Sequence, residues 1–116
     1  MTILHNKACS TSRHAMDVLA DHEVDADVVE YLKSPLDRSA LEDLITKLED
    51  PVEDLVRKDP FFKSLGLDPA DYTTPGAVID LLVEHPRLLQ RPILIKGTRA
   101  IIGRPKDRVA PFLAAD

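Results

Sequence analysis

Cys9 is the only cysteine among the 116 residues, and it lies in the segment HNKACSTSR (residues 5–13). A strand-like run over residues 2–5 precedes this segment, and a helical pattern begins near Ser10. A thiol at the start of a helix faces unpaired backbone N–H groups and the positive end of the helix dipole, which lower its pKa. On composition alone a lone cysteine is more often a packed apolar side chain. Its position nevertheless predicts a nucleophilic Cys9 thiolate.

The same helix start is a predicted anion site. Backbone N–H groups at a helix N-terminus, with hydroxyls such as that of Ser10, suit phosphate-like oxyanions. Arg13 lies about one turn from Cys9 and is expected to reach the same pocket, whereas His14 is rotated further and is expected to be exposed. The alternative for Ser10 and Thr11 is that they only cap the helix.

Spacing separates the possible chemistries of this thiol. Tyrosine-phosphatase-type enzymes use Cys-x5-Arg, but here the arginine follows after three residues, so a phosphatase is disfavoured. A zinc site built on His5, Cys9 and His14 would lack a fourth ligand, so we expect no metal. Cys9 and Ser12 form C-x-x-S, the single-thiol counterpart of a C-x-x-C redox motif, and this predicts a thioredoxin-like fold.

Composition limits the class of protein. With 15 Lys and Arg against 20 Asp and Glu, the net charge of −5 argues against a protein that binds nucleic acid or anionic membranes through bulk positive potential. No apolar run is long enough to span a bilayer, and no signal-peptide pattern is visible. We therefore expect one cytoplasmic domain, residues 1–116, with neither a disulfide nor a membrane segment.

The element order predicts an α/β fold. Residues 2–5 and 26–32 read as strands around the first helix, and Leu41, Leu44, Ile45 and Leu48 follow helical spacing. Further helices are expected across 51–67 and from Pro75 to before Pro86, and strands at 92–96 and 99–103 join through a Gly97-Thr98 turn of type II′. A last helix is expected to open at Pro105, with Val109, Ala110, Phe112 and Leu113 on its buried side. The sum is a small mixed sheet flanked by helices, with a helical insertion at about 37–90.

Five separated segments resemble the glutaredoxin-coupled arsenate reductase family, in that family's order and over almost the whole chain: HNKACSTSR, YLKSPLDRSALEDLI, DLVRKD, EHPRLLQRPILI and IIGRP. The resemblance implies a thioredoxin-like fold with an inserted helical region and arsenate reductase activity. It also implies that Cys9 is the nucleophile, that His5 helps to lower its pKa, and that Asn6 is the motif neighbour of His5.

The resemblance further assigns residues outside the cysteine segment. It implies that Arg57, Arg91 and Arg104 hold the oxyanion, with Ser12 and Pro92 in structural positions at the site; Pro92 matches a cis-proline that faces the cysteine. Without the resemblance, each arginine would be read as a surface residue and Pro92 as a strand-start proline. Lys7 departs from the family pattern, which has proline there.

Reduction of arsenate takes two electrons and therefore a second thiol, which this chain lacks. We expect glutathione as co-substrate and glutaredoxin as the partner that removes it, with no bound cofactor and a monomeric protein. The alternative is a non-arsenate thiol oxidoreductase, or a regulatory protein-binding module like the Spx-type transcription regulators. The three arginines favour the enzyme.

Overall fold

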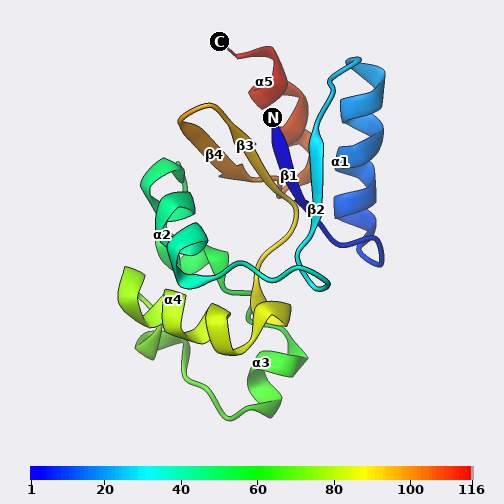
Figure 1. Ribbon diagram of the computed structural model, residues 1–116. Helices are drawn as coiled ribbons and strands as arrows, with labels where there is room; N and C mark the ends of the chain where they lie inside the picture. The colour runs from blue at the N-terminus through cyan, green and yellow to red at the C-terminus, as the bar shows by residue number, and fades with distance from the viewer. Residues whose placement is uncertain (116) are drawn as a thin grey trace.

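A four-stranded mixed sheet organises the computed structural model, which describes residues 1–115 (Figure 1). Its strand order is β2-β1-β3-β4; β1 pairs with β2 in parallel and with β3 antiparallel, and β3 pairs antiparallel with β4. The strands are β1 (Thr2–His5), β2 (Asp27–Glu30), β3 (Ile93–Lys96) and β4 (Arg99–Ile102). The predicted mixed sheet is confirmed.

Helices cover both faces of this sheet. In Figure 1, α1 and α5 lie on one side, whereas α2, α3 and α4 gather on the other, between β2 and β3 in the chain. The helices are α1 (Ser10–Asp21), α2 (Arg38–Lys47), α3 (Pro60–Ser64), α4 (Pro75–Glu84) and α5 (Val109–Ala114). Short 3-10 turns occupy Val52–Leu55, Pro69–Asp71, Pro86–Leu88 and Lys106–Arg108.

Side chains at the helix starts explain where the inserted helices begin. The carboxylates of Asp37 and Asp59 accept the backbone N–H of Ala40 and Phe62, which caps α2 and α3. Thr74 caps α4, where a proline takes the first helical position as expected.

The strands alternate between two apolar clusters. Ile3 packs with α1 and α5 on one face, whereas Leu4 packs with α2 and α4 on the other. Because β1 is a central strand, both of these side chains are buried. The sheet is therefore a two-sided scaffold whose strand ends carry the site.

Most predicted elements are confirmed, with differences at their ends. Gly97 has φ +61° in the β3–β4 turn, the left-handed backbone that a type II′ turn requires of its first residue. Leu48, predicted to belong to α2, lies beyond it and instead bridges Ala100, so it extends the sheet. Pro105 precedes a 3-10 turn, and α5 begins only at Val109. Of the four residues expected on the buried side of α5, two are only partly buried, Ala110 and Leu113.

Within the described part of the chain, every helix is too short or too polar to cross a membrane.

Candidate active site

The loop between β1 and α1 is a hydrogen-bonded turn that presents Cys9. The Cys9 N–H donates to the Asn6 carbonyl at 3.0 Å, and the Ala8 N–H donates to Asn6 Oδ1 at 3.0 Å. Lys7 is the second residue of this turn, a position that suits proline, and its side chain is exposed. The Asn6 side chain therefore closes the turn, which explains how lysine replaces the family's proline there.

The Ser12 side chain holds this loop through hydrogen bonds to His5 and Asn6. It is fully buried; Oγ accepts the Asn6 N–H at 3.1 Å and lies 2.6 Å from Nδ1 of His5. Burial lowers the pKa of His5, the Glu30 carboxylate partly opposes this, and the Arg13 guanidinium lowers the pKa further. His5 is thus a neutral ring bound to Ser12 near neutral pH.

Cys9 caps the N-terminus of α1 and is half-buried. Burial by itself raises the pKa of the Cys9 thiol, but the backbone N–H of Ser12, the Arg104 guanidinium and the backbone N–H of Thr11 together outweigh it. The net effect is a pKa below the usual value for cysteine. The thiolate is stabilised by the helix N-terminus and one arginine.

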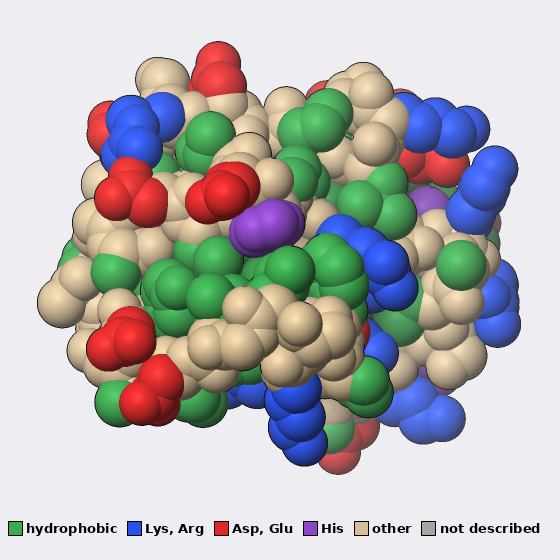
Figure 2. Space-filling model, turned by 90° about the horizontal axis from the view of Figure 1, so that it is seen from below, with side chains coloured by type: hydrophobic (Ala, Val, Ile, Leu, Met, Phe, Trp, Pro, Cys, Tyr) green, Lys and Arg blue, Asp and Glu red, His purple; other side chains and the backbone are tan. Residues whose placement is uncertain are grey.

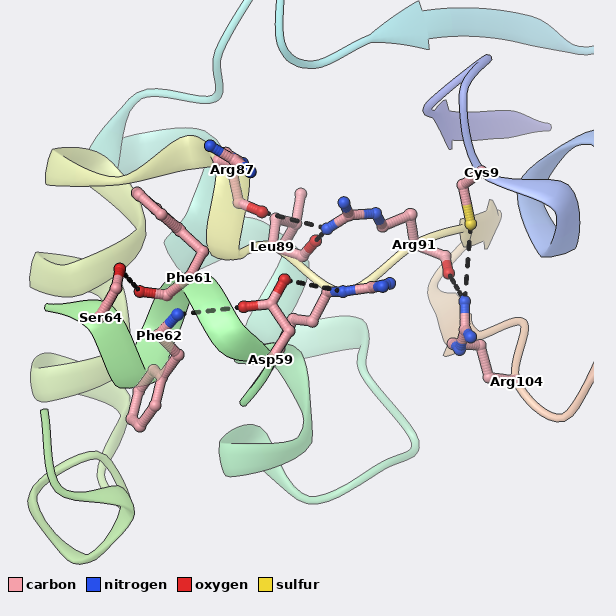
Figure 3. A network of polar contacts seen from close by, with 10 residues as sticks. Cys9, Asp59, Phe61, Phe62, Ser64, Arg87, Leu89, Arg91 and Arg104 are labelled. Carbon is pink, nitrogen blue, oxygen red and sulfur yellow. Dashed lines mark hydrogen bonds and ion pairs between the residues drawn. The ribbon is translucent and has the colours of Figure 1, made fainter.

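The cation beside the sulfur comes from the other end of the chain. Nη1 of Arg104 lies 3.7 Å from Cys9 Sγ and donates to the Arg91 carbonyl at 3.0 Å (Figure 3). Arg13, expected in the pocket, is exposed and donates to the Lys7 carbonyl at 2.9 Å, which braces the loop. Ser10 is exposed, and His14, expected to be exposed, is partly buried.

The other two arginines have protein partners. Nη1 of buried Arg91 donates to the carbonyls of Arg87 and Leu89 at 3.0 and 3.1 Å, so its guanidinium extends away from Cys9 (Figure 3). Nε of Arg57 pairs with the Asp59 carboxylate at 3.1 Å. Arg104 alone of the three has its guanidinium on the sulfur.

The start of β3 and the end of β4 place Arg104. The Arg91–Pro92 peptide bond is cis, as the resemblance implies, and so is the Arg104–Pro105 bond. The Gly103 N–H donates to the Pro92 carbonyl at 2.8 Å, and a Cβ on Gly103 would lie 2.8 Å from Pro92 Cγ. Gly103 was not predicted as a site residue; its signal is a glycine directly before an arginine at the end of a strand.

A cavity of about 370 Å³ opens next to Arg104, between the segment after α2 and the end of β4. Its lining is mostly charged and polar, with two apolar residues: Asp50, Asp54, Val56, Lys58, Gln90, Ile102, Arg104 and Arg108. On the face seen in Figure 2, most Lys and Arg side chains lie on one half and most Asp and Glu side chains on the other. The acidic chain therefore carries a local region of positive charge.

Residues 1–115 hold no cluster of His, Cys, Asp and Glu that could bind a metal ion.

The mixed sheet, the cysteine at the start of α1 and the cis-proline define a thioredoxin-like protein with a single thiol. The chain belongs to the ArsC family, whose model matches residues 4–112. An arsenate reductase of Neisseria meningitidis is 37% identical over 113 residues, 96% of each chain. The global transcriptional regulator Spx of Streptococcus pyogenes is 32% identical, and the alignment covers 100% of this chain and 87% of the regulator. The solved structure of an arsenate reductase from Vibrio cholerae superposes with a TM-score of 0.81 at 28% identity, over 96% of this chain and 97% of that one.

Proposed function

We propose that this protein is an arsenate reductase that works with glutathione and glutaredoxin. The observation that carries the proposal is the Arg104 guanidinium 3.7 Å from Sγ of a cysteine whose pKa is lowered. Arsenate, with about one to two negative charges near neutral pH, would be repelled by a thiolate alone. A guanidinium fork neutralises and orients such an oxyanion. Membership of the ArsC family, with an arsenate reductase 37% identical, supports arsenate as the substrate.

The first proposed step is attack of the Cys9 thiolate on arsenic. An S–As bond forms, and one arsenate hydroxyl takes up a proton from solvent and leaves as water, so arsenic stays pentavalent. Arg104 and the N–H groups at the start of α1 stabilise the negative charge that develops on the oxygens. The resemblance also assigns Arg57 and Arg91 to the oxyanion. In this structure they bond the Asp59 carboxylate and backbone carbonyls, so the proposal requires these side chains to turn toward arsenate when it binds.

The second proposed step uses a thiol from outside the chain. A glutathione thiolate attacks the Cys9 sulfur, the S–As bond breaks, and its electron pair reduces arsenic to the trivalent state of arsenite. Two thiols have then been oxidised to one mixed disulfide, which balances the two electrons. Ser12, where a second cysteine would stand in a C-x-x-C motif, has its hydroxyl on His5 and Asn6, so glutaredoxin is needed to remove the glutathione.

Arsenite release from arsenate, glutathione and glutaredoxin tests the proposal. Wild type should turn over, and Cys9→Ser should not. Arg104→Ala should lose about 10²- to 10³-fold in kcat/KM, as removal of a donor to a developing oxyanion does elsewhere. Arg38→Ala is the matched control, because that exposed arginine pairs with Asp80 on the α2–α4 side.

The second candidate is a regulatory module that binds a protein partner, which the likeness to the Spx regulator favours. Such a module has no need of oxyanion turnover. Absence of arsenite above background from wild type, with the protein folded and Cys9 reduced, would exclude the arsenate reductase and leave the regulator or a thiol oxidoreductase that acts on another substrate.

A further inference from the structure

Tyr31 directly follows β2 and is 1% exposed. Its ring packs in the apolar cluster with α2 and α4. The phenol oxygen has no hydrogen-bond partner within the described chain. A buried hydroxyl without a partner costs free energy, so its retention calls for an explanation.

Sheet register places Tyr31 at the site. β1 pairs with β2 up to His5 and Glu30, so Asn6 and Tyr31 form the next row of that parallel pair. On its other side β1 pairs with β3 at Leu4 and Ile93, so the same row continues to Arg91.

Residues two apart along a strand share a face. Leu4, Val29 and Ile93 all pack on the α2–α4 face. Tyr31 therefore lies on that face, in the same row as Asn6 and Arg91, and Asn6 begins the turn that presents Cys9.

Arg91 carries a second unpaired donor in this row. Its Nε lacks a hydrogen-bond partner although Arg91 is buried, with only 8% of the residue exposed. Arg91 Nε–H donates only, and the Tyr31 hydroxyl can donate one hydrogen bond. Two buried donors in one row, neither of them with an acceptor, are complementary to an oxyanion.

We propose that Tyr31 is a further ligand of the oxyanion: its phenol O–H donates to an arsenate oxygen that the Arg91 Nε–H also contacts. This inference rests on the proposed oxyanion chemistry at Cys9. Tyr31 adds a donor that brings no charge, so it orients the oxyanion without holding it as tightly as another arginine would.

The surroundings keep the phenol in its donor form. Burial raises the pKa of Tyr31, and the Cys9 thiolate adds to this, while the nearby Arg91, Asn6 and Arg57 side chains oppose it. The net pKa lies above the usual value for tyrosine, so the O–H is retained at neutral pH.

The test is protection of Cys9 by arsenate against iodoacetamide, measured for wild type, Tyr31→Phe and Tyr72→Phe. Tyr72, the other tyrosine, is the matched control, since it packs against Phe62 on the helical insertion. Tyr31→Phe should raise the half-protecting arsenate concentration by about tenfold. Its alkylation rate without arsenate should match wild type, and its Tm should be equal or higher, because an unpaired buried hydroxyl is removed. Tyr72→Phe should protect as wild type does.

Equal protection of wild type and Tyr31→Phe would overturn the inference. Weaker protection accompanied by a lower Tm would also overturn it, because that result assigns Tyr31 a structural role. Protection of wild type that weakens in Tyr31→Phe supports the inference even if no arsenite is released with glutathione and glutaredoxin. In that case only the proposed function fails.

Discussion

The reactivity of Cys9 depends on which groups face its sulfur. Burial disfavours the thiolate, while two backbone N–H groups at the start of α1 and the Arg104 guanidinium favour it. His5 is not among these groups: it is bound to Ser12 and its pKa is lowered by burial. The resemblance implies that His5 lowers the pKa of Cys9; in this geometry His5 contacts the loop through Ser12, and Arg104 carries the charge.

Arg104→Ala should shift the pH dependence of Cys9 alkylation toward higher pH. In wild type the rate of reaction with iodoacetamide should reach half its maximum below the usual pKa of a cysteine, because the thiolate is the nucleophile. Removing the guanidinium removes one of the groups that lower the pKa, so the midpoint should rise. The rate is measured from about pH 5 to about pH 10, a range that includes the pKa of a free thiol and values well below it. Superimposable profiles would show that Arg104 does not stabilise the thiolate.

At the scale of elements, the site lies where the ends of the four strands come together at one edge of the sheet. The parallel strands β1 and β2 deliver the cysteine loop and Tyr31 to one edge of the sheet, and the antiparallel hairpin β3–β4 brings its start and its end to the same edge. The contact between Gly103 and Pro92 fixes how closely those two hairpin ends approach. Arg104 follows Gly103 directly, so its reach to Cys9 depends on that contact.

Gly103→Ala should therefore destabilise the protein and disturb the site together. Its methyl group would lie 2.8 Å from Pro92 Cγ and 3.4 Å from Val109 Cγ2, so the hairpin ends must separate. We expect a loss of about 1–3 kcal/mol in the free energy of unfolding, typical of overpacking. The pKa of Cys9 should rise as Arg104 moves.

Gly76→Ala is the control for this change, because no atom lies within 4 Å of a Cβ built there. Its stability in urea should equal or exceed that of wild type, since alanine suits a helix better than glycine. Wild-type stability and alkylation in Gly103→Ala would contradict the role given to the contact.

Residue spacing predicts the local parts of this site, whereas its distant arginines are named only by the resemblance. Cys9 at a strand-to-helix boundary is readable because neighbours in the chain create its environment. Arg104 lies 95 residues away, and its contact with Cys9 arises only when the hairpin pairs with β1. Residue spacing alone placed Arg13 in the pocket, but an accessible backbone carbonyl, that of Lys7, holds its guanidinium instead. Resemblance selects Arg57 and Arg91 yet does not reveal that both bond to protein groups.

At the scale of the whole molecule, charge is distributed unevenly. The chain carries a net charge of −5, which repels anions at long range. Carboxylates pair with other arginines of the chain, such as Glu49 with Arg99 and Asp50 with Arg108. Arg104 has no such carboxylate partner among the ion pairs of residues 1–115. An anion at Cys9 thus meets a local positive field within an acidic protein.

This local field predicts a preference of Cys9 for an anionic reagent. The ratio of the alkylation rate with iodoacetate to that with neutral iodoacetamide should exceed the ratio for glutathione at low salt, because Arg104 attracts the carboxylate. The ratio should fall as salt is raised, since the Debye length shrinks to about 10 Å at 0.1 M and exposed charges are screened. Arg104→Ala should lower the ratio, whereas Arg38→Ala, whose guanidinium pairs with Asp80, should leave it unchanged. A wild-type ratio below that of glutathione that rises with salt would mean that the thiol experiences the net negative charge, and the site would then be unsuited to an oxyanion.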